Sequence, residues 1–201
     1  MNTGINISFV QERYQRMNDD ELIRIATRDA SGLTPEAMEV VKAEIKKRKL
    51  DENISNGVEA QNKTYSKEEV DAYCDILCNL SCPLCGNTTE RINATMTGEV
   101  MSFVVFTIYN KKIKVGCPDC LDKANNSALA WSAILGWWGL PWGIIRTPHA
   151  ISLNLKSKQT NHAKGHNDYL RIFTMGVIGE VETYKDNQEK LQQIVARQNR
   201  L

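Results

Sequence analysis

Four cysteines arranged in two pairs constrain this chain more than any other feature. Each pair has the pattern Cys-Pro-x-Cys: Cys82 with Cys85, and Cys117 with Cys120. A two-residue spacer lets both sulfurs of a pair face one ion, and four thiolates complete a tetrahedral zinc site. Such a closed site has no open position for water or substrate, so the pattern predicts one structural Zn²⁺.

The cysteine pairs and the segment between them resemble a zinc ribbon. In that family each pair lies at a turn, and a small antiparallel sheet lies between the pairs. The run from Cys117 to Asn126, followed by Gly136-Trp-Trp-Gly-Leu-Pro-Trp-Gly143, is also similar to bacterial zinc-ribbon proteins that carry a Trp-rich hydrophobic segment. The resemblance implies a zinc site and proximity to a membrane. It implies a fold more than an activity, because zinc ribbons serve as nucleic-acid modules, docking modules and enzyme staples.

The overall charge gives no indication of a polyanionic partner. The 201 residues include 25 Lys and Arg and 24 Asp and Glu, which gives a formal net charge of +1. The N-terminal residues are polar and lack the basic, apolar and small-residue order of a signal peptide. Paired thiols without a signal peptide fit a reducing compartment, so we expect a cytoplasmic protein.

Capping patterns predict helices on both sides of the cysteines. Asn18 with Glu21 and Ser66 with Glu69 have capping-box spacing, and Thr34 precedes a proline at a first helical position. We therefore expect an α+β fold, in which a small antiparallel zinc-ribbon sheet is flanked by an N-terminal helical hairpin, a Trp-rich hydrophobic helical segment and C-terminal helices. The predicted segments are a helical hairpin at 1–50, a linker at 51–65, a capped helix plus zinc ribbon at 66–123, the Trp-rich segment at 124–157 and C-terminal helices at 158–201.

Residues rich in β-branched and aromatic side chains predict three strands between the cysteine pairs. These strands fall at 90–95, 99–109 and 112–115, with turns at 96–98 and 110–111. The run from Phe103 to Phe106 lacks polar alternation, so we expect both faces of its strand to be covered. A zinc ribbon alone is too small to cover them, so the N-terminal helices or the Trp-rich segment should pack there.

All four tryptophans lie in one uncharged stretch, from Ala124 to Ile145. Its 22 residues are enough to span a bilayer as a helix. At 3.6 residues per turn, large apolar side chains share one face and small residues share another, as in closely packed membrane helices. The large face contains Trp131, Ile134, Leu135, Trp138, Trp142 and Ile145, and the small face contains Ser132, Gly136, Gly139 and Gly143. Because tryptophan favours the membrane interface, the predicted membrane or partner contacts are Trp131, Trp137, Trp138 and Trp142.

Three interpretations of this stretch stay open: a single transmembrane helix, a re-entrant or interfacial hairpin bent at Gly136–Gly143, and a buried core segment of a soluble domain. Pro141 and the glycines should interrupt the helix. A single span should carry positive charge mainly on its cytoplasmic side, whereas here Lys123 precedes the stretch and Arg146 follows it. Basic residues on both flanks favour the hairpin, lying at the cytoplasmic face of a membrane.

The chain shows no enzyme signature. It lacks a glycine-rich phosphate loop, a His-Glu-x-x-His motif and a Gly-x-Ser-x-Gly motif, and its three histidines offer few general bases. We therefore expect a non-enzymatic adaptor or scaffold with one structural zinc, associated with the inner face of the cell membrane. Its partners would be a membrane surface or membrane protein and an unidentified protein. No small-molecule substrate is inferred.

Two other functions stay open. In a nucleic-acid-binding zinc ribbon, four lysines around the second cysteine pair would contact phosphates: Lys111, Lys112, Lys114 and Lys123. In a thiol redox protein, either Cys-x-x-Cys pair would react, which bound zinc would exclude. Cys74 and Cys78 lie on the apolar face of the predicted helix after Ser66. We interpret them as core residues, with a second metal or redox role as the alternative.

Overall fold

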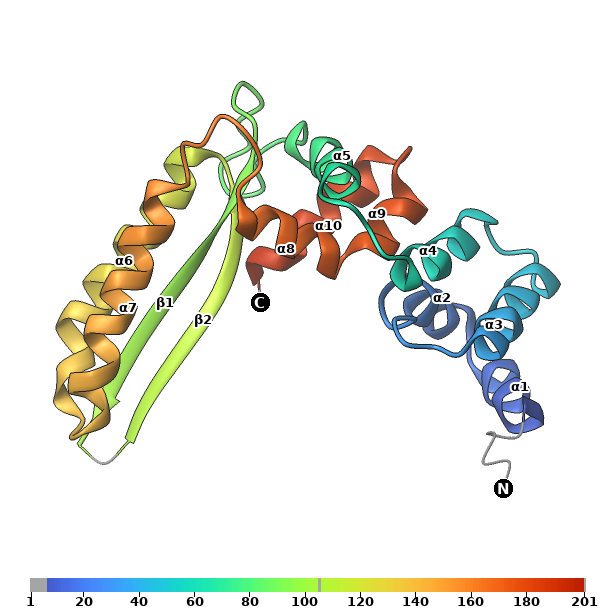
Figure 1. Ribbon diagram of the computed structural model, residues 1–201, viewed down its shortest axis with the longest axis horizontal. Helices are drawn as coiled ribbons and strands as arrows, with labels where there is room; N and C mark the ends of the chain where they lie inside the picture. Colours follow the sequence, from blue (N-terminus) through green and yellow to red (C-terminus); the bar gives the residue numbers. More distant parts are fainter. Residues whose placement is uncertain (1–6, 105, 201) are drawn as a thin grey trace. The chain divides into compact units, whose positions relative to one another are not determined.

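The computed structural model describes residues 7–104 and 106–200, which form an α+β fold with a single two-stranded antiparallel sheet (Figure 1). The chain folds into two compact units, each built from segments far apart in sequence. Unit 1 comprises Met1–Glu69 and Thr174–Leu191, and unit 2 comprises Val70–Phe173 and Gln192–Leu201. The divisions fall inside three helices: α5 (Lys67–Cys78), α8 (Asp168–Gly176) and α10 (Gln188–Arg200).

Unit 1 is helical, and its capping signals are confirmed. The Asn18 side chain accepts from the Glu21 N–H at 2.8 Å, and the Glu21 carboxylate accepts from the Asn18 N–H at 3.1 Å. Thr34 Oγ1 accepts from the Ala37 N–H at 3.3 Å. These caps begin two of the five helices that lie wholly within the described part of this unit: α1 (Ile7–Arg16), α2 (Asp19–Arg28), α3 (Pro35–Lys47), α4 (Asn53–Asn62) and α9 (Ile178–Tyr184).

The predicted linker at 51–65 is wrong, because α4 occupies most of it. Ile54 and Val58 lie one turn apart on α4 and are buried in the core of unit 1. Gly57 lies where α9 crosses, and a Cβ there would come 2.8 Å from the Gly179 carbonyl oxygen. The helix thus packs through a glycine contact and a narrow apolar stripe, which leaves a weak periodic signal in the sequence.

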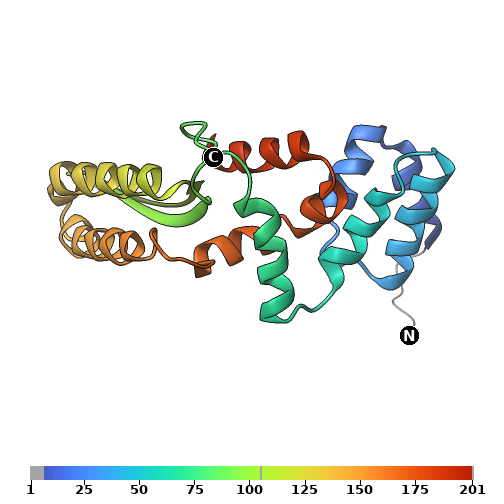
Figure 2. The same cartoon turned by 90° about the horizontal axis from the view of Figure 1, so that it is seen from above.

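Unit 2 contains a hairpin of two long strands and a hairpin of two long helices. We call these two hairpins together, residues 93–104 and 106–159, the arm (Figures 1 and 2). The strands β1 (Asn93–Phe103) and β2 (Phe106–Gly116) pair antiparallel along their whole length. The helices α6 (Pro118–Leu135) and α7 (Trp142–Gln159) run side by side along β1 and are joined through the short 3₁₀ helix η1 (Gly136–Trp138). The predicted interruption of the Trp-rich helix is confirmed, because the chain reverses between Leu135 and Trp142.

The prediction of three strands is wrong: the cysteine pairs are joined by two strands of 11 residues each. The predicted turns at 96–98 and 110–111 lie inside these strands, and the chain turns after Phe103 instead. Gly98 marks a close approach rather than a turn. A Cβ at this position would come 2.8 Å from the Leu153 side chain on α7, and glycine within a strand commonly serves such contacts.

The two helices of the arm place their small residues inside and their large residues outside. Ser132, Gly136, Gly139 and Gly143 are all buried, as the small-face pattern predicts. The strand end is also uncovered: Val104 is 79% exposed, and Phe103 and Phe106 are more than half exposed. The prediction that both faces of this strand are covered is therefore wrong, and Val105 lies outside the described residues. Among the described helices, none is both long enough and apolar enough to cross a bilayer.

Candidate metal centre and the apolar tip of the arm

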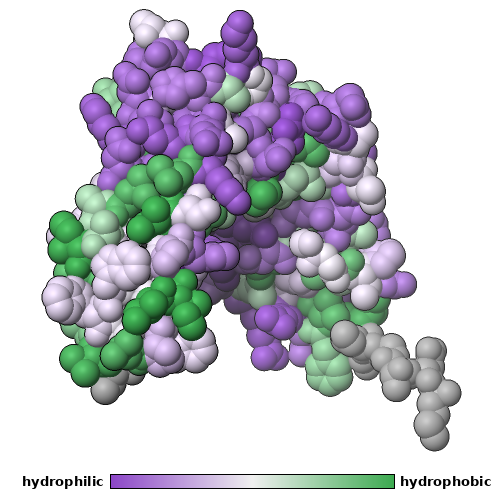
Figure 3. All heavy atoms as spheres, turned by 60° about the vertical axis from the view of Figure 1, so that its left-hand side comes forward, coloured by the Kyte–Doolittle hydropathy of each residue, from purple (hydrophilic) through white to green (hydrophobic). Residues whose placement is uncertain are grey.

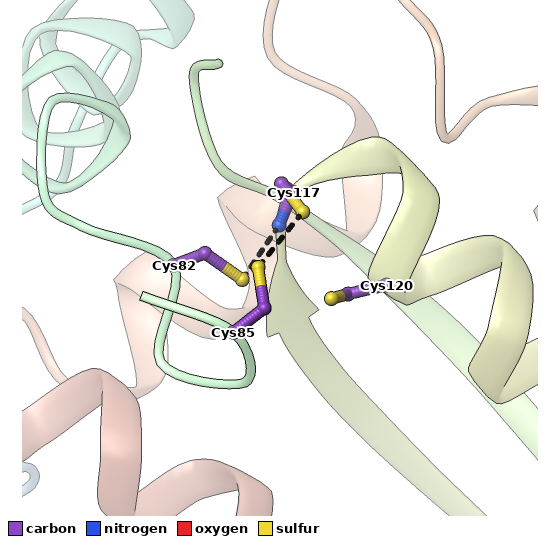
Figure 4. Close-up of side chains that lie close together, drawn as sticks. All are labelled: Cys82, Cys85, Cys117 and Cys120. Atoms are coloured by element: carbon purple, nitrogen blue, oxygen red, sulfur yellow. Dashed lines mark hydrogen bonds between the residues drawn. The ribbon is translucent and has the colours of Figure 1, made fainter. Parts of the chain in front are cut away.

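The first cysteine pair lies in a tight loop between α5 and β1. Gly86 N–H donates to the Cys82 carbonyl at 2.8 Å, and Cys82 N–H donates to the Asn87 carbonyl at 2.8 Å. Gly86 has a φ of 76°, a left-handed conformation that glycine adopts without steric cost. The loop therefore curls around Cys82 and Cys85 and directs both side chains to one side (Figure 4).

The second pair lies where β2 passes into α6. Cys117 follows the last residue of β2 and is the N-cap of α6, Pro118 occupies the first helical turn, and Cys120 lies in the same turn. Proline at this position does not disturb a helix, because the first N–H groups have no partner within the helix. The positive end of the helix dipole also favours ionised thiols at this place.

The four sulfur atoms converge at the base of the arm. All four Sγ atoms lie within 4.8 Å of one another, and Cys85 Sγ lies 3.7 Å from Cys117 Sγ (Figure 4). Four sulfurs at the usual zinc–sulfur bond length of about 2.3 Å would be separated by about 3.8 Å in a tetrahedron. The Cys117 N–H also donates to Cys82 Sγ at 3.2 Å. The donor set and its spacing therefore fit one metal ion.

The electrostatics of the cluster favour a cation among the sulfurs. Burial opposes ionisation of Cys82, but three N–H groups outweigh it, those of Cys117, Leu84 and Cys85, and lower the Cys82 pKa to about 7. Burial raises the pKa of Cys117, and burial together with the neighbouring cysteines raises that of Cys120. A divalent cation would offset the repulsion that the thiolates exert on one another.

Cys74 and Cys78 lie outside this cluster. Both are buried on α5, with 0% and 4% of their surface exposed. Burial raises the pKa of Cys78 to about 12, which keeps this thiol protonated at neutral pH. These properties favour packing of two small apolar side chains over metal binding or redox chemistry.

The four lysines proposed as phosphate contacts do not form one cluster. Lys111 and Lys112 are adjacent on β2, so their side chains point to opposite faces of the strand. Lys114 donates to the Asn199 carbonyl at 2.6 Å, and burial lowers the pKa of its ammonium group. Lys123 lies on α6 and is exposed. This arrangement weakens the case for a nucleic-acid surface at the second cysteine pair.

All four predicted tryptophan contacts lie at the far end of the arm, where the two hairpins reverse. Their exposed fractions are 52% for Trp131, 44% for Trp137, 69% for Trp138 and 55% for Trp142. Other large apolar side chains are exposed around them. The residues that we call the tip are Phe103, Val104, Phe106, Ile108, Trp131, Ile134, Trp137, Trp138, Leu140, Trp142, Ile144 and Ile145. Figure 3 shows hydrophobic residues gathered over this part of the arm.

A polar network runs through the interior of the arm, among buried apolar residues such as Val100 and Leu121. Asn125 on α6 accepts from Thr95 Oγ1 at 2.8 Å, and donates to the Met96 carbonyl at 3.1 Å and to Asn154 Oδ1 at 3.2 Å. Asn154 on α7 in turn bonds both backbone groups of Gly98. This network was not anticipated from the sequence. Asparagines in line with small residues on the buried faces of α6 and α7 were the available signal.

No known protein family, curated protein or solved structure matches this chain. The assignment of a metal centre therefore rests on the four cysteines and their geometry.

Proposed function

We propose that this protein is a non-enzymatic adaptor that docks on the cytoplasmic face of a membrane by inserting the tip of its arm into the lipid surface. A structural zinc would hold the base of the arm, and the helices of unit 1 would contact a protein partner. The observation that carries the proposal is the packing of α6 and α7, which bury mostly small and polar residues while large apolar residues are exposed at the tip.

Exposure on this scale calls for a partner. Monomeric proteins that remain in water rarely expose contiguous apolar patches larger than a few hundred Å². The tip contains 12 large apolar side chains, and Leu140, Trp138 and Val104 are each about 70% exposed or more. Transferring such side chains from water into an apolar phase is favourable by about 25 cal/mol per Å².

A lipid surface suits the shape and chemistry of the tip. The tip is the outer end of two hairpins rather than a groove, so it can enter another phase without a shaped counterpart. Its tryptophans match the interfacial layer of a bilayer, where amphipathic rings are enriched. Many backbone groups of the arm are already paired, because β1 and β2 bond each other and α6 and α7 bond within themselves, which lowers the cost of entering an apolar phase.

The cysteine chemistry supports the cytoplasmic side. Thiolate zinc sites persist in reducing compartments, where disulfides are rare. The charge of the arm fits this side as well, because the cytoplasmic leaflet is the more anionic one. The chain contains no Asp or Glu from Val100 to Pro118 or from Lys123 to Asn167, so these segments would not be repelled by anionic lipids.

Vesicle co-sedimentation tests the proposal. The wild-type chain should pellet with vesicles of phosphatidylcholine and phosphatidylserine. Trp138→Gln combined with Leu140→Gln should weaken binding at least tenfold, because both side chains are exposed at the tip. Phe9→Gln combined with Ile172→Gln is the matched control, since it removes two exposed apolar side chains outside the arm. A wild-type chain that stays in the supernatant would overturn the proposal.

A further inference from the structure

The structure places four lysines from three elements at one level of the arm. In the strand register, Lys111 lies opposite Gly98, and Lys112 is the next residue. Asn154 of α7 bonds both backbone groups of Gly98, and Asn125 of α6 bonds Asn154. These contacts bring Gly98, Asn125 and Asn154 to the same height along the arm.

Lys123 and Lys156 extend this level to the two helices. Lys123 lies two residues before Asn125 on α6, and Lys156 lies two residues after Asn154 on α7. Because the helices run in opposite directions, both offsets point toward the base of the arm, by about 3 Å each. We call Lys111, Lys112, Lys123 and Lys156 the basic belt, and all four are exposed.

The belt lies at a well-defined distance from the tip. Five residues of extended strand separate Gly98 from Phe103, which is about 17 Å. Twelve helical residues separate Asn154 from Trp142, which is about 18 Å. The two independent elements agree, so the belt circles the arm about 17–21 Å from its end.

This spacing matches the layers of a lipid leaflet. Interfacial elements bury their apolar residues about 5–10 Å below the boundary of the acyl chains. A tip at about 10 Å depth would place the belt about 7–11 Å outside that boundary, at the outer edge of the headgroup layer or a few Å beyond it, within reach of a flexible lysine side chain. Arg146 lies nearer the tip than the belt and is held against the arm, 5.6 Å from the Trp142 ring centre and donating to the Thr107 carbonyl at 3.3 Å. Within the belt, Lys111 also contacts a ring, with its Nζ 5.1 Å from the Tyr109 ring centre.

The belt keeps an excess of positive charge. Asp122 lies near its level but faces Lys158 at 3.8 Å and His162 at 3.3 Å. Glu99 on β1 and Asp119, one turn before Lys123 on α6, are also near the belt, and the four lysines outnumber them. Positive charge on several sides of the arm fits a surface that surrounds the arm, as headgroups do around an inserted tip.

We propose that the basic belt binds the phosphate and carboxylate groups of anionic lipids, so that the arm selects anionic membranes over neutral ones. This inference rests on the proposed function, since the tip must insert for the belt to reach the headgroups. Insertion of the tip sets how deeply the arm enters the bilayer, and the belt sets the preference for anionic lipids. Each basic residue near an anionic surface strengthens binding by about fivefold.

The test is vesicle co-sedimentation of the full chain at two lipid compositions. One set of vesicles is pure phosphatidylcholine, and the other contains roughly 30% phosphatidylserine. Wild type should bind the anionic vesicles at least tenfold more tightly than the neutral ones. Lys111→Gln combined with Lys112→Gln should remove about 30-fold of the affinity for the anionic vesicles. The matched control is Lys46→Gln combined with Lys47→Gln, which removes two exposed adjacent lysines from α3 and should leave binding unchanged.

A second double variant, Lys123→Gln with Lys156→Gln, repeats the test on the helices in case the strand substitutions disturb folding. Equal binding of wild type to neutral and anionic vesicles would overturn the belt while leaving the proposed function intact. Equal losses in the belt and control variants would also overturn it, because net charge alone would then explain the effect. A labelled oligonucleotide tests the other polyanion at roughly 0.15 M salt. If it binds tightly to wild type and the belt variants abolish this binding, the ligand of the belt is nucleic acid and the lipid proposal is overturned. Binding to neither vesicle would overturn the proposed function itself.

Discussion

At the scale of single residues, glycines and cysteines set the geometry of unit 2. A Cβ at Gly143 would come 2.5 Å from the Gly136 carbonyl oxygen, a backbone atom that cannot move away cheaply. The sequence predicts the small face to which these glycines belong, because the 3.6-residue period aligns them. It does not predict what the small face packs against, since that depends on Ser102 of the strand.

Gly143→Ala should lower the free energy of unfolding by about 2 kcal/mol, because the added methyl group overpacks the crossing of α7 with η1. Chemical denaturation followed by circular dichroism measures the change. Gly165→Ala is the control, since a Cβ there would meet no heavy atom within 4 Å. Equal stability of the two variants would show that the close approach at Gly143 is not a constraint.

The four clustered cysteines give a second prediction at this scale. The purified protein should contain one zinc per chain, and Cys82→Ser should lose the metal, because a closed site needs all four thiolates. Cys74→Ala should keep the full zinc content, since Cys74 is buried outside the cluster. Elemental analysis of protein produced with zinc checks both, and less than half an equivalent in the wild type would contradict the assignment.

At the scale of elements, the sequence predicts features that depend on neighbouring residues and misses features that depend on contacts with distant segments. The caps at Asn18, Thr34 and Ser66 are confirmed, because a cap is a contact between residues three positions apart. The helix α4 and the true turn after Phe103 were missed. The helix packs against the distant α9, and the strand continues through Gly98, which packs against Leu153 of α7. Local periodicity reports neither contact.

The polar network inside the arm links its helices to its sheet, because Asn125 of α6 bonds both β1 and Asn154 of α7. Asn125→Ala should lower the free energy of unfolding by about 2 kcal/mol or more, because it leaves the partners of Asn125 buried without their hydrogen bonds. Asn126→Ala is the control on the same helix, where the side chain is exposed. Thermal denaturation compares the two, and equal melting temperatures would rule out a stabilising role for the network.

At the scale of the whole molecule, the cysteine cluster and the tip occupy opposite ends of the arm. Cys117 and Cys120 lie at the start of α6, and the first cysteine pair precedes β1, so the candidate metal centre lies where the two layers meet at their base. The sequence predicts which four cysteines would bind the metal and which four tryptophans would contact a membrane or partner. It does not predict that Phe103, Val104 and Phe106 join the tryptophans in one exposed tip, because the register that brings them together is tertiary.

Removing the metal should therefore affect unit 2 first. Metal binding contributes on the order of 10 kcal/mol to folding at such sites, so a strong chelator should lower the melting temperature of unit 2. The core of unit 1 contains none of the four cysteines and should retain its helices. Hydrogen exchange read by mass spectrometry separates the units, and equal deprotection of both would contradict the placement of the metal in unit 2 alone.

The most direct test of membrane docking uses the tryptophans themselves. All four lie between residues 131 and 142, and all four are exposed at the tip, so selectively excited tryptophan fluorescence reports on this part of the molecule alone. Adding vesicles of phosphatidylcholine and phosphatidylserine should shift the emission to shorter wavelength, and lipids brominated on the upper acyl chain should quench it. Emission that keeps its wavelength and is not quenched at saturating lipid would contradict insertion of the tip.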